Sequence, residues 1–265
     1  MKYTASLQMA LALTVTCFLP SATLLAGSHK TSGDSRMKEN TVKLVSATNV
    51  LGYDVFDKEG KKVGDMANFV LDLSEAPRLT HVIVMTGGFL NVGGTNRAVP
   101  AKALSWNGER YVLPVDRATF EDAPVLPDNL ERFFGRASNL KQLAKNFDVK
   151  PMSIDGDILF FDELDFHNIE STESGIIGYL TDVYLTVDHE LTPYLIMAPT
   201  DPMLDTNTLS RYAIPTTAFV EADDPDLVFD ITIEDLLTAG MVESTDGIKA
   251  ELADRGLAYK LDISQ

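Results

Sequence analysis

Residues 51–106 decide the fold, and they read LGYDVFDKEGKKVGDMANFVLDLSEAPRLTHVIVMTGGFLNVGGTNRAVPAKALSW. Residues 57–60, Asp-Lys-Glu-Gly, are typical of a tight turn, because the glycine at their end tolerates positive φ. Apolar and polar residues then alternate over residues 68–73 with the period of a β-strand. After the break at Pro77, residues 81–85 form a β-branched run that is apolar on both faces. This pattern predicts a β-meander of short strands.

A glycine-hinged hairpin joins two of these strands. Gly87-Gly88 and Gly93-Gly94 bracket residues 89–92, and a further strand begins at Arg97. A phosphate-binding loop would need a helix or a Lys-Ser/Thr pair after the glycines, so the pattern favours a structural hairpin. Another strand is expected over residues 111–115. Short strands with short connections and no crossover helix predict a small antiparallel barrel.

The stretch resembles a PRC-barrel domain over residues 47–122. The shared features are an opening turn, a strand end, a glycine hairpin and a following strand, in the family's order: Gly52, Val55, Asp57, Gly60, Val63 and Gly64; Leu71-Asp72-Leu73; Gly87-Gly88-Phe89-Leu90 with Gly93-Gly94; and Ala98-Val99-Pro100. PRC-barrel domains are binding and assembly modules, found in the photosynthetic reaction-centre H subunit and in a ribosome maturation factor. The family has no shared catalytic residues, so the resemblance implies binding and no catalytic site.

A weaker copy of the stretch returns about 114 residues later. The matching pairs are Val63-Gly64 with Ile177-Gly178, Val82–Val84 with Leu195–Met197, Val99-Pro100 with Ile214-Pro215, and Tyr111–Val115 with Leu227–Ile231. Residues 198–204 replace the glycine hairpin. The expected fold is therefore mainly β, with two small antiparallel PRC-type β-barrels, residues 47–122 and 158–242, joined by an amphipathic helix. Each barrel is expected to have its own core and to fold independently.

The connector, residues 123–157, carries the helical pattern. Asp128 is the expected N-cap, with Glu131 at the reciprocal capping-box position, and Gly135 partly breaks the helix. Apolar and basic side chains lie on opposite faces: Leu130, Phe133, Phe134, Leu140 and Leu143 against Arg132, Arg136, Lys141 and Lys145. The favoured interpretation is a connector packed on one barrel; the alternative is a helix that binds a membrane surface.

The two ends of the chain are expected to lie outside the barrels. Residues 1–26 resemble a signal peptide of an exported bacterial protein, and the alternative is an uncleaved membrane anchor over residues 7–26. Residues 27–46 predict a disordered leader, and residues 243–265 a short helix with a possible edge strand. Cys17 is the only cysteine, so a cleaved chain would contain no disulfide. This is compatible with a periplasmic location.

Charge excludes one class of partner and suggests another. The net charge is −17, which argues against nucleic-acid binding because phosphates would be repelled. Nineteen Asp and Glu lie between residues 151 and 240, with Arg211 as the only Lys or Arg. None of the acidic runs has the ligand order of an EF-hand, so solvated loops are favoured over a calcium site. Mutual repulsion of these carboxylates is expected to make moderate salt or mild acid stabilising.

No residue pattern predicts catalysis, a metal site or a cofactor. The histidines are His29, His81, His167 and His189, and none is spaced from another, or from a cysteine, as zinc ligands are. Hydrolase and metalloprotease motifs are absent from the sequence. His81 is expected to be packed in a strand or at an interface, and histidine titration is not expected to drive acid unfolding. The sequence predicts a protein that is not an enzyme.

The candidate partner-binding residues are Phe89, Leu90 and Val92 at the hairpin tip, because exposed apolar residues often mark interaction sites. The alternative is that Phe89 folds back and plugs its own barrel. The favoured function is a periplasmic or cell-envelope adaptor or assembly protein that binds an unidentified envelope protein. Two alternatives remain open, an acidic small-ligand or divalent-cation-binding protein and a membrane-anchored scaffold.

Overall fold

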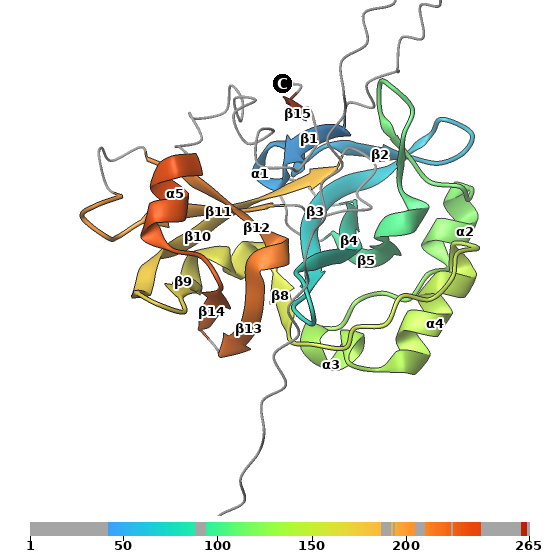
Figure 1. Ribbon diagram of the computed structural model, residues 1–265. Helices are drawn as coiled ribbons and strands as arrows, with labels where there is room; N and C mark the ends of the chain where they lie inside the picture. Colours follow the sequence, from blue (N-terminus) through green and yellow to red (C-terminus); the bar gives the residue numbers. More distant parts are fainter. Residues whose placement is uncertain are drawn as a thin grey trace, which may run out of the picture. The chain divides into compact units, whose positions relative to one another are not determined.

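Two β-sheets dominate the structure, a computed structural model that describes residues 42–87, 94–186, 192, 194–204, 210–223, 225–239 and 261–263 (Figure 1). The first has the order β5-β4-β3-β2-β7-β6 and the second the order β12-β11-β10-β9-β14-β13. The first repeat comprises β2 (Asp54–Phe56), β3 (Lys62–Asp72), β4 (Arg78–Thr86), β5 (Thr95–Pro100), β6 (Ser105–Trp106) and β7 (Tyr111–Val112). The second repeat comprises β9 (Asn168–Ser171), β10 (Gly175–Thr186), β11 (Tyr194–Pro199), β12 (Tyr212–Pro215), β13 (Phe219–Asp223) and β14 (Asp226–Phe229). The internal copy inferred from the sequence therefore has the same strand order as the original.

The sheets differ from the expected antiparallel barrels in two respects. β2 pairs with β7, and β9 with β14, in parallel, so both sheets are mixed. Among the described residues, the main path of pairings runs from β5 to β6 and from β12 to β13, and no closed barrel is formed. Alternation along a strand identifies its buried face but not the direction of its neighbour, which explains why the sequence did not reveal the parallel pairs.

A close approach of two strands explains one glycine in each repeat. A Cβ atom on Gly64 would lie 2.3 Å from the carbonyl oxygen of Met85, and one on Gly178 would lie 2.4 Å from that of Ala198. Real Cβ atoms do not approach backbone oxygens so closely, so only glycine fits without a shift of the backbone. The correspondence between these two glycines is therefore structural as well as sequential.

The two repeats exchange strands. β1 (Val42–Ser46) precedes the first repeat but pairs antiparallel with β10, whereas β8 (Ile158–Phe160) precedes the second repeat and pairs with β3. Leu44 faces Thr186 in the first pairing, and Ile158 faces Asp72 in the second. Ile158 lies 114 residues after Leu44, and Thr186 lies 114 residues after Asp72. The exchange is therefore reciprocal, and both pairings have the same register.

The buried apolar side chains do not form two separate cores. One continuous cluster extends from Ala47 to Leu236 and contains residues of both repeats, such as Phe69 and Leu185. Residues 39–265 accordingly form one compact unit. The expectation of a separate core for each repeat is therefore wrong, because each exchanged strand contributes side chains to the sheet of the other repeat.

The connector forms two helices, α3 (Leu130–Phe134) and α4 (Ala137–Asn146), separated at Gly135 as expected. The N-cap is Asn129 and not Asp128, since the Asn129 side chain accepts a hydrogen bond from the backbone N–H of Arg132 at 2.7 Å. The apolar faces of both helices pack on the first sheet and β8 in a second cluster: Val70, Ile83, Ala98, Phe133, Phe134, Leu140, Leu143 and Phe160. The connector packs as expected, and its apolar face is not available to a membrane.

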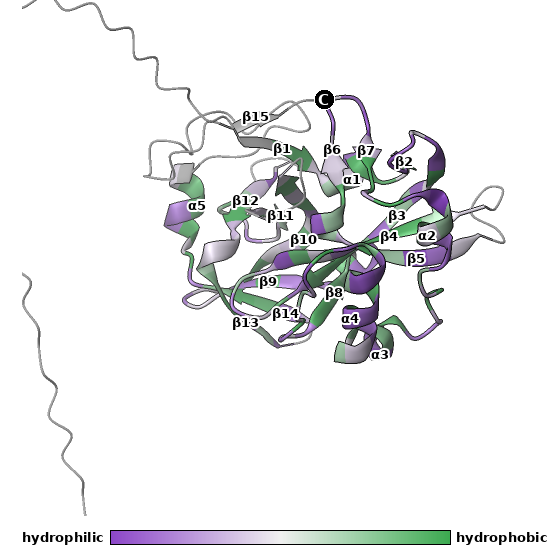
Figure 2. Ribbon diagram, turned by 90° about the vertical axis from the view of Figure 1, so that its right-hand side faces the viewer, coloured by the Kyte–Doolittle hydropathy of each residue, from purple (hydrophilic) through white to green (hydrophobic). Residues whose placement is uncertain are grey.

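Shorter helical segments complete the fold. They are α1 (Ala47–Val50), α2 (Arg117–Glu121), α5 (Ile233–Ala239) and the 3-10 turns Ala101–Ala103, Phe161–Phe166 and Thr216–Ala218. Figure 2 colours the ribbon by hydropathy: much of β3 and β4 is hydrophobic, whereas α4 carries many hydrophilic residues. No helix among the described residues is long and apolar enough to cross a membrane.

Both ends of the described chain meet on one sheet. β15 (Leu261–Ile263) pairs in parallel with β1, within the C-terminal region where an edge strand was expected. The last five residues of the expected leader form β1 and are ordered by their pairing with β10. The expected signal peptide, the rest of the leader and the expected C-terminal helix lie outside the described residues.

Candidate functional site

The hairpin tip predicted to bind a partner lies outside the described residues, and so do Phe89, Leu90 and Val92. The strands that lead to it are described, and their last pair is Thr86 with Thr95, as expected for a hairpin. In the second repeat, the equivalent region carries Met203 and Leu204. Met203 is exposed, whereas Leu204 is buried in the core. The roles of Phe89, Leu90 and Val92 stay predictions.

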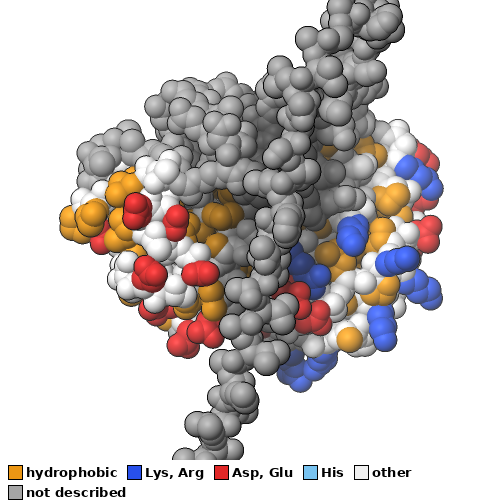
Figure 3. Space-filling view, in the orientation of Figure 1, with side chains coloured by type: hydrophobic (Ala, Val, Ile, Leu, Met, Phe, Trp, Pro, Cys, Tyr) orange, Lys and Arg blue, Asp and Glu red, His pale blue; other side chains and the backbone are white. Residues whose placement is uncertain are grey.

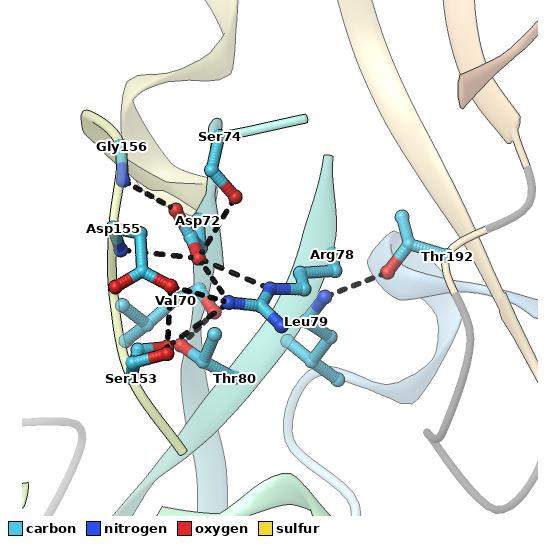
Figure 4. A network of polar contacts seen from close by, with 10 residues as sticks. All are labelled: Val70, Asp72, Ser74, Arg78, Leu79, Thr80, Ser153, Asp155, Gly156 and Thr192. Atoms are coloured by element: carbon cyan, nitrogen blue, oxygen red, sulfur yellow. Dashed lines mark hydrogen bonds and ion pairs between the residues drawn. The ribbon is translucent and has the colours of Figure 1, made fainter. Parts of the chain in front are cut away.

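The junction of the two repeats contains a buried carboxylate, Asp72, at the end of β3 (Figure 4). Its carboxylate accepts hydrogen bonds from the Arg78 guanidinium at 2.7 and 3.0 Å and from the backbone N–H of Gly156 at 2.9 Å. Arg78 also donates to the Ser153 carbonyl at 3.2 Å. These bonds fasten the segment before β8 to the first repeat and compensate the desolvation of Asp72.

A second link joins β4 to the second repeat. The backbone N–H of Leu79 donates to the Thr192 hydroxyl at 2.9 Å, and both residues are buried. The Thr216 hydroxyl in turn donates to the Thr192 carbonyl at 2.8 Å. The first sheet, the loop at Thr192 and the turn after β12 are thus connected by backbone-directed hydrogen bonds.

Polar side chains repeat with the exchanged strands. Asn68 donates to the Asp162 carboxylate at 2.6 Å, and the backbone N–H of Thr48 donates to the carboxylate of Asp182 at 3.2 Å. The two links are related by the same offset of 114 residues (182 − 68 and 162 − 48). Burial raises the pKa of Asp182, while the hydroxyl of Ser46 donates to its carboxylate and opposes that rise. Polar links at equivalent positions of the two repeats therefore join them at the exchanged strands.

His81 lies on β4 at the centre of the second apolar cluster. Its ring is 5.2 Å from that of Phe134, and its Nδ1 atom has no hydrogen-bond partner among the described residues. Burial lowers the pKa of His81 to about 4, because the charged imidazolium would lose its hydration. The prediction of a packed histidine is confirmed. The expectation that histidine titration plays no part in acid unfolding is not compatible with this burial.

Titratable side chains are the possible ligands of a metal ion in the described part of the chain. Among the described residues, no group of three or more His, Cys, Asp or Glu side chains is placed to hold a metal ion. The Nδ1 atom of His167 lies 3.0 Å from the Glu163 carbonyl oxygen. His29 and His189 lie outside the described residues.

The exposed side of α3–α4 carries most of the unpaired positive charge of the described chain. Among the described residues, six exposed Lys and Arg form no ion pair; one is Lys102, and the other five lie on α3 and α4 or shortly after them: Arg132, Arg136, Lys141, Lys145 and Lys150. We call this surface the basic face. On the side drawn in Figure 3, Lys and Arg gather over the first repeat and its helices, and Asp and Glu predominate over the second repeat. The fold thus separates charge that the sequence already places in different segments.

The comparison with protein families agrees with the first sheet. Residues 43–119 match the model of the PRC-barrel domain family. The matched range of the PRC-barrel domain begins within β1 and includes all six strands of the first repeat. The match does not extend to the second repeat, although the strand order is the same. No curated protein matches the chain.

Asp72 belongs to the strand-end motif Leu71-Asp72-Leu73 of the PRC-barrel domain, and its role was not recognised from the sequence. The motif indicated where β3 ends, but a carboxylate at a strand end is more often solvated than buried. Arg78, only six residues later, was the available signal for an ion pair. Most of the basic face, by contrast, follows directly from helical spacing; only Lys150, which lies after α4, does not.

Proposed function

We propose that the chain is a non-enzymatic assembly protein of the cell envelope whose basic face binds an acidic surface on a protein partner. The proposal is supported by the PRC-barrel domain at residues 43–119, since PRC-barrel domains are binding and assembly modules. The second repeat would then be a diverged PRC-barrel domain fused to the first. Location at the envelope rests on residues 1–26, which resemble a signal peptide.

The observation that carries the proposal is the basic face. The chain has a net charge of −17 and therefore many carboxylates that could neutralise these cations. The five cations of the basic face nevertheless form no ion pair with any described residue. The helices that carry the cations are anchored by buried Phe134 and Leu143, so the charges are held on a rigid support. Oriented charges of this kind accelerate association with an oppositely charged partner and determine its orientation.

A protein partner is favoured over a membrane surface. A membrane-bound amphipathic helix needs its apolar face to enter the lipid, whereas Phe133, Phe134 and Leu140 are buried against the first sheet. Only the charged side of α3–α4 is exposed. An acidic protein surface requires no more than that.

Affinity capture from envelope extract, with matched charge reversals, tests the proposal. Lys145→Glu alters the basic face, and Lys102→Glu alters an exposed lysine on the turn after β5. We expect the partner to be recovered with the wild type and with Lys102→Glu, in a salt-dependent manner, and to be reduced severalfold with Lys145→Glu. Equal recovery with both variants at low and high salt would refute a role for the basic face.

Mass spectrometry of the mature chain tests the location. An N-terminus after residue 22 or 26 supports export, while an intact Met1 on a membrane-bound chain supports the anchored scaffold.

A further inference from the structure

Two surface hollows lie at equivalent positions of the two repeats. The first, of about 370 Å³, is bordered by Tyr53, Trp106 and Tyr111, and the second, of about 630 Å³, by His167, Ala222 and Leu227. The strand register relates them, since Tyr111 faces Val55 and Trp106 in the first repeat as Leu227 faces Ile169 and Ala222 in the second. Tyr53 precedes Val55 by two residues, as His167 precedes Ile169.

The fold does not require aromatic rings at this position. In the second repeat, the same strand order is built with an imidazole, a methyl group and an isobutyl group in place of the three rings. The second hollow is also lined by residues of other segments, among them Leu73, Glu131 and Glu163. The aromatic lining of the first hollow is therefore a property of that site and not a demand of the sheet.

Three aromatic rings pack together at the first hollow, with Tyr111 in contact with both others. Tyr111 lies at the bottom, 1% exposed, and its ring centroid is 4.8 Å from that of Trp106 and 6.3 Å from that of Tyr53. Tyr53 is 43% exposed, unusual for a large aromatic residue, and Trp106 is partly exposed. A guest that enters the hollow from solvent would contact the exposed parts of Tyr53 and Trp106, which Tyr111 supports from the core.

The charges at the hollow are balanced by ion pairs, so a preference for a cation would come from the aromatic rings. The guanidinium carbon of Arg110 lies 4.7 Å from the centroid of Phe56, so a neighbouring ring in the same hollow already attracts a cation of its own chain. The carboxylates of Asp54 and Glu109 also line the hollow, and that of Asp54 pairs with the Lys62 ammonium at 2.8 Å. Arg110 pairs with Glu109, 3.6 Å away, and lies over the face of Phe56, so its charge is already partnered within the chain.

We infer that the hollow between Tyr53, Trp106 and Tyr111 binds an organic ammonium group. Aromatic faces attract such cations through their quadrupoles and bind alkylated ammonium particularly well, because its weak hydration costs little to remove. The volume lies within the range of small-ligand sites. The site is distinct from the basic face, so the inference goes beyond the proposed function. The cation would come either from a free small molecule or from a methylated lysine of a protein.

Trp106 makes the site directly observable, because it is the only tryptophan of the chain. Choline would be titrated into the full chain while Trp106 fluorescence is recorded, next to the uncharged carbon isostere of choline. We expect a saturable change with choline and none, or a much weaker one, with the isostere. A peptide that carries trimethyl-lysine is the second arm. Tighter binding of the peptide than of choline would identify a methylated lysine as the source of the cation. Equal binding of the two would identify a free small molecule.

Variants locate the response. Tyr53→Ala removes an exposed ring and should weaken choline binding about tenfold, while Tyr179→Ala, which removes another exposed tyrosine on β10, should leave it unchanged. Thermal melts confirm that both variants are folded. The inference is overturned if choline gives no saturable change, if the isostere binds as tightly, or if Tyr53→Ala binds choline like the wild type.

Discussion

Replacing His81 should remove a specific part of the pH dependence of stability. In the folded chain, burial lowers the pKa of His81 from 6.5 to about 4. The unfolded chain therefore binds a proton at His81 before the folded chain does, and stability falls as the pH decreases. The contribution is fully present above pH 6.5 and is lost as the pH falls toward 4.

The size of the effect follows from that difference. The pKa changes by about 2.5, and each pKa step corresponds to about 1.36 kcal/mol, so folding loses about 3 kcal/mol through His81 between pH 7 and pH 4. This is a large fraction of the stability of an ordinary domain. Carboxylates titrate over the same interval, so the wild type alone cannot isolate the histidine.

Urea unfolding of the wild type, His81→Leu and His81→Gln at several pH values between 7 and 4 isolates it. Neither variant has an ionisable group at this position, and the carboxylates are common to all three proteins. We expect the free energy of unfolding of the wild type to fall by about 3 kcal/mol relative to each variant as the pH decreases. His81→Leu and His81→Gln should differ from each other in absolute stability, because only Gln buries an amide, but not in pH dependence. A constant difference between the wild type and both variants would refute the reasoning.

Three further predictions follow from the junction and the glycines. Asp72→Asn should destabilise the chain by about 2 kcal/mol in urea unfolding, because the buried side chain at this position loses its charge-assisted hydrogen bonds with Arg78; a loss below about 0.5 kcal/mol would contradict a role of Asp72 in joining the repeats. Gly64→Ala should lower the melting temperature well below that of Gly135→Ala, since a Cβ atom on Gly64 would meet the Met85 carbonyl at 2.3 Å and one on Gly135 lies no closer than 3.1 Å to its nearest neighbour. A chain that ends near Ala123 lacks β8 and the second apolar cluster, so its thermal unfolding should be broad by circular dichroism; a sharp transition would indicate that the first repeat folds without the exchanged strand.

Local features of the fold could be predicted because each depends on residues close in sequence. Period-2 alternation identified most of the strands, the glycines identified the turns, and helical spacing identified α3 and α4 with their break at Gly135. Gly64 and Gly178 were recognised as equivalent from their sequence context alone. Four residues of the basic face, Arg132, Arg136, Lys141 and Lys145, followed from the same helical pattern, and Lys150 lies beyond α4.

Long-range pairing was decided only by the tertiary structure. Alternation shows which side of β1 or β8 is apolar, but Leu44 would be equally buried on the first sheet or on the second. The choice depends on which free strand edge is within reach, and the chain brings β1 to β10 and β8 to β3, so that the repeats share one core. The burial of Asp72 and His81 follows from this choice, because neither residue is buried until the connector and β8 cover the first sheet. A sequence specifies the apolar faces of its strands, whereas the partner of each face is selected by the packing of the whole chain.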